Sequence, residues 1–417
     1  MSSRPSPRGD LPLYVITLGH ALTHWYPSSF FLILPVLAGQ IGLSYTQVGL
    51  LITVRSITLT LVNLPGGAIV DMVGRRGLLM ALSLAWCCVP YFFLGLTSNY
   101  TLILVCSALM GVGNNLWHPA AISDLAERYP TRRGWVLSIH ALGANLGDLL
   151  GPLAVGFLLV SMAYTDVFVA NLVPGLLLAG LFFLWVRSES ATEPGSERLS
   201  VRRYWEGVKA LGRNGAVILL SIVGGIRAMT QTGLSTFIPF YLAGLGMSPA
   251  LVGAYLAVVQ GAGLIASPAS GSLSDRFGRK PFVAGGMLAV SVIVVIFANL
   301  TLISLPGVDF VWLFVAALAL IGFFLFALRP AMQAWTMDMV PREMGGTTVG
   351  LMFGSQSLFS AVSPAVGGVL ADSYGLMATF YFIAATILVA NVIVMLVPDR
   401  LLASAGSPGP VAVREGA

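Results

Sequence analysis

Charged residues are scarce in this sequence. Asp, Glu, Lys and Arg make up only 9% of the 417 residues, whereas hydrophobic residues make up 57%. A soluble domain carries roughly a quarter charged residues and under half apolar ones. Because no water-soluble fold of this length could bury so much apolar surface, the composition excludes a soluble protein and predicts an integral membrane protein.

Cysteine is also scarce, and the motifs of common enzymes are missing. Cys87, Cys88 and Cys106 lie inside apolar runs without disulfide or metal-ligand spacing, which is typical of cysteines that act as small hydrophobic residues. The sequence contains no Walker loop, H-E-x-x-H or G-x-S-x-G motif, and no polar stretch long enough for a catalytic domain. We therefore expect no enzyme activity, no cofactor, no metal site and no nucleic-acid partner.

Apolar segments of membrane-spanning length recur along the chain. A spanning helix needs about 20 mostly apolar residues. This rule predicts twelve spans, over 12–37, 45–70, 77–97, 101–124, 135–160, 166–187, 216–243, 250–273, 282–304, 310–335, 346–370 and 377–397. The first is not a cleavable signal peptide, because it is too long, contains His20 and His24, and is not closed by an A-x-A site. The predicted fold class is an all-α, multi-pass integral membrane protein.

Positive charge is missing from every second loop. One set of loops holds Asp166, Asp309 and Asp372 but no Lys or Arg. The other set holds the basic residues Arg75, Arg76, Arg128, Arg132, Arg133, Arg187, Arg198, Arg202, Arg203, Lys209, Arg213, Arg276, Arg279, Lys280, Arg342 and Arg400. By the positive-inside rule, the basic loops and both termini are predicted to be cytoplasmic, in a cell membrane that we expect to be a bacterial inner membrane.

The two halves of the chain repeat each other. A shift of 204 residues places GAIVDMVGRR (67–76) on GSLSDRFGRK (271–280). Shifts of 211 and 212 residues place His118 on Arg329, Pro152 on Pro364 and Gly156 on Gly368. The predicted organisation is a cytoplasmic tail (1–11), a six-helix bundle (12–187), a polar cytoplasmic linker (188–215), a second six-helix bundle (216–397) and a cytoplasmic tail (398–417), in a chain expected to be a monomer.

The two repeated loops resemble the loop motif of the major facilitator superfamily of secondary transporters. The resemblance covers residues 11 to 400 and implies twelve transmembrane helices in two pseudo-symmetric six-helix bundles. Within the superfamily, WHPAA (117–121) and SIHALGANLGDLLGP (138–152) are similar to the fosmidomycin-resistance type of exporter.

The loop motif has two interpretations. Asp71 and Asp275 stand at the predicted cytoplasmic ends of helices 2 and 8, close to the next helix and within reach of Arg75 and Arg279. Four glycines of the motif allow helices to approach closely: Gly67, Gly74, Gly271 and Gly278. The cluster predicts a latch that breaks when the cytoplasmic side opens. The alternative is a set of loop charges that only fixes topology.

Helix 5 carries an imperfect version of the family's antiporter motif, GANLGDLLGPLAVG (143–156), into which Asp148 intrudes. Gly147, Gly151 and Pro152 predict a face for close packing and bending during transport, although ordinary packing without a coupling role is the alternative. The arginine that antiporters often carry four residues before a glycine of helix 4 is missing, because Ser107 stands four residues before Gly111. Proton coupling must therefore use other groups.

Ionisable residues inside the predicted spans are rare, costly and by default functional. They are His20, His24, Arg55, His118, His140, Asp148, Arg227 and Arg329, accompanied by the neutral Gln231, Gln260, Gln333 and Gln356. A spacing of four puts the two members of each of three pairs on one helix face: His20 and His24, Arg227 and Gln231, and Arg329 and Gln333. The family resemblance implies that helices 1, 4, 7 and 10 line the central cavity. The predicted substrate-binding residues are His20, His24, Arg55, His118, Arg227, Gln231, Arg329 and Gln333.

Positive charge exceeds negative charge at this depth. Arg55, Arg227 and Arg329 stay cationic at biological pH, whereas Asp148 is the only obvious carboxylate. A bound anion is the natural counter-charge, because guanidinium groups fork onto carboxylates and phosphonates. The alternatives are that some arginines reach carbonyls or snorkel, and that Arg55 pairs with Asp148. Asp148, His24 and His118 are the predicted proton carriers, with hydrogen-bonded packing as the alternative for the histidines.

These features predict a secondary transporter that works by alternating access, with proton-coupled efflux of a small organic anion or an anionic antibiotic. The alternatives are uptake of an organic anion by proton symport and a non-transporting sensor or scaffold on the same fold. Export of varied hydrophobic drugs is a third alternative, which the buried cations disfavour.

Overall fold

The computed structural model describes residues 10–73, 75–187, 209, 212–302, 310–340 and 345–398. The side chains of 63–72, 114, 115 and 185–187, among others, lie outside the description. The two tails and most of the linker predicted over 188–215 therefore lie outside the described residues.

The first half of the chain folds into seven helices that make six crossings: α1 (Leu11–Ile41), α2 (Tyr45–Val73), α3 (Arg76–Leu94), α4 (Tyr100–Arg128), α5 (Arg133–Ser161), α6 (Tyr164–Ala170) and α7 (Leu172–Arg187). Polar caps and glycines set several helix ends. The Asn99 side chain accepts a hydrogen bond from the Leu102 amide at the start of α4, and Gly42 ends α1 with a φ of 70°.

The second half contains α9 (Gly215–Gly244), α10 (Pro249–Phe277), α11 (Arg279–Ala298), the 3₁₀ turn η1 (Leu300–Leu302), α12 (Phe310–Asp338), α13 (Gly345–Ser360), α14 (Val362–Tyr374) and α15 (Leu376–Leu396). Eleven helical stretches in the described residues are long and apolar enough to cross a membrane. The interrupted pair α13–α14 supplies the twelfth crossing, so the prediction of twelve spans in two six-helix bundles is confirmed.

Three predicted spans differ in detail from the helices. The span over 166–187 is broken at Asn171, whose carbonyl and side chain accept hydrogen bonds from Tyr26 and Trp25 of α1 (2.9 and 2.6 Å). The span over 346–370 is broken at Ala361, whose carbonyl accepts a hydrogen bond from Thr53 of α2 (2.7 Å). The span over 282–304 begins earlier, and its α-helix ends at Ala298. Hydropathy reports the apolar length of a segment, whereas these breaks depend on partners from distant helices.

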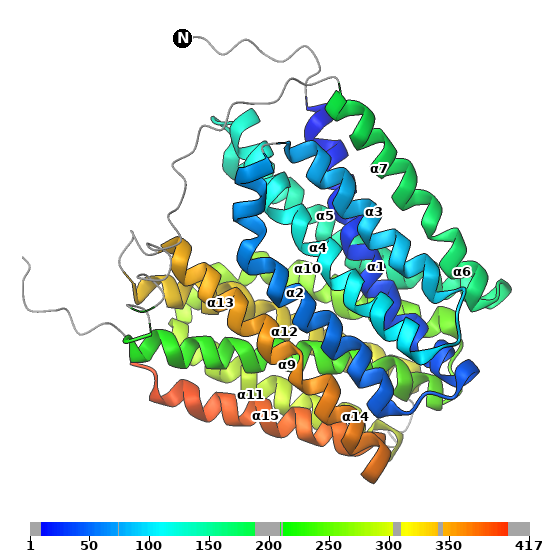
Figure 1. The fold of residues 1–417 in the computed structure, drawn as a ribbon. Helices are drawn as coiled ribbons and strands as arrows, with labels where there is room; N and C mark the ends of the chain where they lie inside the picture. The colour runs from blue at the N-terminus through cyan, green and yellow to red at the C-terminus, as the bar shows by residue number, and fades with distance from the viewer. Residues whose placement is uncertain are drawn as a thin grey trace, which may run out of the picture.

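The helices form two bodies that meet near one end (Figure 1). Within the first bundle α1 packs on α5 and α4 packs on α2 and α3; within the second, α9 packs on α13 and α12 packs on α10 and α11. Between the bundles, α2 lies against α13 and α14, and α5 lies against α10. We call the side whose loops carry Arg and Lys the basic side, and the opposite side the non-basic side.

Close backbone contacts join the bundles on the non-basic side. A Cβ atom added to Gly49 would lie 2.0 Å from the Pro364 carbonyl oxygen, and one added to Gly253 would lie 2.4 Å from that of Pro152. The repeat relates these contacts, because a shift of 204 takes Gly49 to Gly253 and a shift of 212 takes Pro152 to Pro364. The two halves therefore meet through two equivalent contacts, in each of which a glycine of one bundle packs against a proline carbonyl of the other.

A carboxylate adds a contact that the repeat does not duplicate. Asp372, in the last turn of α14, accepts hydrogen bonds from the amides of Tyr45 and Thr46 at the start of α2 (2.9 and 2.8 Å). A carboxylate on exposed helical N–H groups satisfies them and suits the positive end of the helix dipole. Desolvation would raise the pKa of Asp372, but the hydrogen bonds from Thr46, Tyr45 and Ser44 outweigh it and lower the pKa. We call this contact the α2–α14 clasp.

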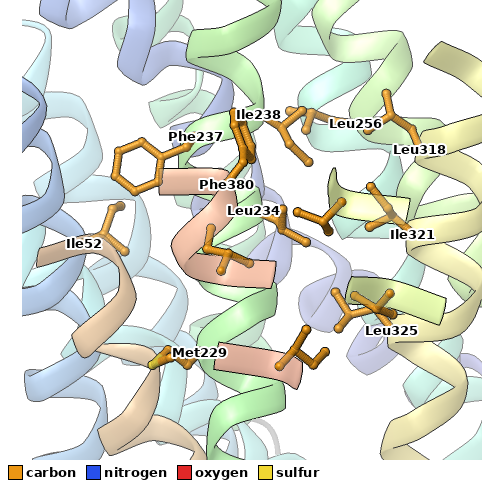
Figure 2. Close-up of a cluster of buried hydrophobic side chains, with 14 of the residues drawn as sticks. Ile52, Met229, Leu234, Phe237, Ile238, Leu256, Leu318, Ile321, Leu325 and Phe380 are labelled. Carbon is orange, nitrogen blue, oxygen red and sulfur yellow. The ribbon is translucent and has the colours of Figure 1, made fainter. Parts of the chain in front are cut away.

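The apolar core of the second bundle gathers around α9 (Figure 2). Leu234 and Ile238 of α9 lie among Leu256 of α10 and Ile321 of α12, and Ile52 of α2 approaches from the first bundle. Dispersion and close packing, rather than expulsion from water, hold such contacts together in a bilayer.

Glycines on α5 fit it against α1. Added Cβ atoms would lie 2.3 Å from the Thr17 carbonyl at Gly143, 2.0 Å from the Ala21 carbonyl at Gly147 and 2.7 Å from Ser28 Oγ at Gly151. The glycine-rich face that the sequence predicts on helix 5 is therefore a packing face for α1. Its role in bending stays a prediction.

The Gly147→Ala substitution tests this interface. The new methyl group would meet backbone, so the helices must separate, and we expect a loss of about 1–3 kcal/mol in the free energy of unfolding. Gly134→Ala, on the same helix with nothing within 4 Å of its added Cβ, is the matched control and should not lower stability. Thermal unfolding in detergent measures both; equal melting temperatures for the two variants would contradict the packing model.

Asp372→Asn tests the clasp. The loss of charge should widen the distance between the bundles on the non-basic side. Double electron–electron resonance measures this distance between spin labels at Gln40 and Leu245 in a cysteine-free background. Because the pKa of Asp372 is lowered in the clasped state, its contribution is present above the ordinary value of 3.8 and is lost as the pH falls below it. Asp166→Asn, another acid of the non-basic loops, should leave the distance unchanged; widening in both variants would argue against the clasp.

Candidate functional site

A cavity lies between the two bundles, beyond their non-basic contact. Arg55, Asp148, Gln231 and Gln260 are polar residues of its wall, and Pro152 lies beside them. The apolar wall includes Leu234, Ile238, Leu256, Ile321 and Leu325, which Figure 2 shows on α9, α10 and α12. Both bundles thus contribute polar side chains to one cavity.

Arg55 and Arg227 find neutral partners. Arg55 donates to the Pro27 carbonyl at 3.5 Å, and its guanidinium lies 4.8 Å from the centre of the Phe31 ring. Arg227 is only 3% exposed and donates to Gln231 Oε1 at 3.0 Å and to the Leu325 carbonyl at 3.4 Å. Arg227 and Gln231, which a spacing of four places on one helix face, are therefore hydrogen-bonded to each other. Arg55 and Arg227 also reach backbone carbonyls, which is one of the alternatives to a bound anion.

Arg329 of α12 is exposed, and its guanidinium lies 5.5 Å from the centre of the Phe353 ring on α13. Neither Arg329 nor its neighbour Gln333 is among the residues that line the cavity described above. Arg329 is nevertheless close enough to Arg227 and Asp148 to interact electrostatically with both. It therefore belongs to the charged surroundings of the cavity.

Asp148 pairs with a histidine rather than an arginine. Its Oδ2 atom lies 3.0 Å from Nδ1 of His24, and the two side chains are 26% and 24% exposed. The alternative in which Asp148 forms an ion pair with Arg55 is not the arrangement seen, although the two interact electrostatically. Among the described residues, Arg55, Arg227 and Arg329 have no carboxylate in ion-pair contact.

The four histidines of the chain gather in one cluster inside the first bundle. The ring of His20 lies 4.9 Å from His24, 5.0 Å from His118 and 3.9 Å from His140, measured between centres. His24 and His118 are 5.9 Å apart. Sequence spacing predicts that His20 and His24 share a face, but it does not bring His118 and His140 to them, because that depends on how α4 and α5 pack on α1.

The loop motif forms its predicted ion pair in the second bundle. Arg279 lies 2.6 Å from Asp275 and 3.2 Å from Asp338, both in the same bundle. In the first bundle, Gly74 and the side chain of Asp71 lie outside the described residues, and Arg76 pairs with Glu127. A shift of 211 takes Glu127 to Asp338, so each half ties the start of its third span to the end of its fourth. The role of these pairs as a latch stays a prediction.

Sequence reasoning missed the groups that close the non-basic side. It classed Asp372 only as a loop acid, and it used Pro364 and Gly368 only as markers of the repeat. The signal was present, because small residues matched between repeats are candidates for the surface on which the repeats meet. Nothing in the sequence says that Asp372 reaches α2.

The comparisons with known proteins agree with this architecture. The family model of the Major Facilitator Superfamily matches residues 16–308 and 220–412. The fosmidomycin resistance protein of Escherichia coli (strain K12) is 25% identical over 404 residues, which cover 93% of each chain. The multidrug resistance protein MdtG of Salmonella typhi is 26% identical over 328 residues, covering 77% of this chain and 78% of the relative.

Among solved structures, a bacterial homolog of the human lysosomal transporter Spinster, in an inward-facing and occupied conformation, has a TM-score of 0.79 at 18% identity. It covers 98% of this chain and 100% of its own. The likeness to the fosmidomycin-resistance type that the short segments predict is thus confirmed at low identity. The fold, the repeat and the family model lead to one conclusion: the chain belongs to the Major Facilitator Superfamily and is a membrane transporter, not an enzyme.

Proposed function

We propose that this protein exports a small organic anion by alternating access, in exchange for protons, across a bacterial inner membrane. The basic side is the cytoplasmic side in this proposal, with both termini there. The bundles meet on the non-basic side, so the conformation described here is inward-facing. Rocking of the bundles about the contacts at Gly49 and Gly253 would expose the cavity to the other side.

The excess of positive charge near the cavity is the observation that supports an anionic substrate. Arg55 on α2 lines the cavity. Arg227 donates to Gln231 and Leu325 of its wall, and Arg329 interacts electrostatically with Asp148. The carboxylate of Asp148 is itself hydrogen-bonded to His24. An uncompensated charge inside a membrane is costly, and a carboxylate or phosphonate would supply the missing counter-charge. A cavity volume of about 180 Å³ is below the roughly 300–1,000 Å³ of drug-sized sites, which favours a small anion over a large drug.

Efflux is supported by the names of the relatives, a fosmidomycin resistance protein and a multidrug resistance protein. Uptake of an organic anion by proton symport is the other direction that the same site would serve. Proton coupling, with Asp148, His24 and His118 as the expected carriers, remains a prediction.

Transport in proteoliposomes tests the proposal. Vesicles are loaded with fosmidomycin or a simple carboxylate, and flux is followed under pH gradients of either sign and in exchange without a gradient. Arg227→Gln and Arg329→Gln should each reduce exchange about tenfold or more, because a hydrogen bond to a charged group contributes about 1.5–3 kcal/mol. Undiminished exchange in both variants would refute the anion site.

Arg132→Gln is the matched control, since Arg132 pairs with Asp10 at the surface and is 51% exposed; it should transport like the wild type. Flux that follows an opposing proton gradient supports exchange, whereas flux with the protons would replace efflux by symport. Transport of cations or neutral drugs alone would overturn the anionic substrate.

A further inference from the structure

We propose that His20, His24 and His118 form a binding site for a divalent late first-row transition-metal ion such as Zn²⁺, inside the first bundle. One ring nitrogen from each of these side chains lies within 4.8 Å of the others. The site is distinct from the cavity that Arg55 lines, and its existence does not depend on which anion the protein carries.

The spacing of the rings suits a single ion. Three imidazoles on one tetrahedral ion, with metal–nitrogen bonds of about 2.0–2.1 Å, would have ring centres about 5 Å apart. The centres of His20, His24 and His118 are 4.9, 5.0 and 5.9 Å apart.

The hydrogen bonds leave lone pairs free for a metal. Nδ1 of His20 lies 2.7 Å from the His140 carbonyl oxygen, which only accepts, so this nitrogen carries the proton and Nε2 carries a lone pair. Nδ1 of His24 faces the carboxylate of Asp148, which places the lone pair of His24 on Nε2 in the same way. Both Nε2 atoms are buried and lack a hydrogen-bond partner among the described residues.

This pattern is that of a metal-binding histidine. Such histidines almost always donate their second N–H group to a backbone carbonyl or a carboxylate, which orients the ring and strengthens the ligand. His20 has the first partner and His24 the second. A buried lone pair without a donor costs free energy, and a bound cation would remove that cost at two rings together. His140 stacks flat on His20, with an interplanar angle of 10°, and so positions it rather than joining the ligand set.

The site has an entry path and a preference in chemistry. His20 is only 5% exposed, whereas His24 is 24% exposed next to Asp148, which lines the cavity. An ion would therefore enter from the cavity past His24. Neutral imidazoles favour Zn²⁺, Co²⁺, Ni²⁺ or Cu²⁺ over the hard Mg²⁺ and Ca²⁺. Asp148 offsets the positive charge of the ion, and Arg329, which interacts electrostatically with His118, opposes it.

Binding is tested on the full-length protein in detergent, purified without a histidine tag and with Cys87, Cys88 and Cys106 replaced by Ala. We expect calorimetry to show one Zn²⁺ ion per chain and no Mg²⁺, and Co²⁺ to give the visible absorption of a tetrahedral nitrogen site. His24→Gln and His118→Gln should each lower Zn²⁺ affinity at least tenfold. Asp148→Asn should lower it about 10–100-fold, as loss of the group that orients a ligand does.

His140→Gln is the matched control, because it removes the fourth histidine but keeps the backbone carbonyl that holds His20; it should bind Zn²⁺ like the parent. Circular dichroism and gel filtration establish that each variant is folded. Absence of Zn²⁺ binding by the folded parent, or equal affinity in parent, His24→Gln and His118→Gln, overturns the site.

In liposomes with an enclosed Zn²⁺ indicator, flux of Zn²⁺ would identify the ion as cargo, and binding without flux would identify it as a resident ion.

Discussion

The contact of backbone against backbone on the non-basic side is the constraint on which the rest of the structure depends. Gly49 against Pro364 and Gly253 against Pro152 allow no side chain between the helices. Because lipid tails are as apolar as the helices, close approach of this kind is a main source of attraction between spans. Two equivalent contacts on one side bring the bundles together there and leave their facing surfaces beyond this point to form the cavity.

The same geometry decides where charge is tolerated. Arg227 is almost fully buried in the second bundle, and its two hydrogen bonds go to an amide and a backbone carbonyl. Arg55 uses a carbonyl and an aromatic ring in the first bundle. Neutral partners accept hydrogen bonds from one nitrogen of each guanidinium but do not balance its charge, so an excess of positive charge persists across the boundary between the bundles. An anion bound there would contact both bundles, which is what alternating access requires of a substrate site.

The sequence predicts what is local or repeated. Hydropathy gives the twelve spans, the repeat gives the two bundles, and a spacing of four pairs Arg227 with Gln231. It does not give the breaks at Asn171 and Ala361, because the free carbonyls there are satisfied by Tyr26 and Thr53 from other helices. Nor does it give the histidine cluster, because the packing of α5 on α1 brings His140 beside His20, and the packing of α4 on α1 brings His118 there.

Asp148 connects the cavity, the histidine cluster and the second bundle, because it lines the cavity, contacts His24 and interacts electrostatically with Arg329. It shares a bundle with His24 and Arg55, whereas Arg329 lies on the other bundle. The proposed rocking of the bundles would leave the distance from Asp148 to His24 nearly fixed but would change the distance from Asp148 to Arg329. An electrostatic term that depends on conformation would therefore cross the boundary between the bundles. An ion held by His24 and His118 would draw the charge of Asp148 toward α1 and α4, and so alter the balance between the two conformations without touching the substrate.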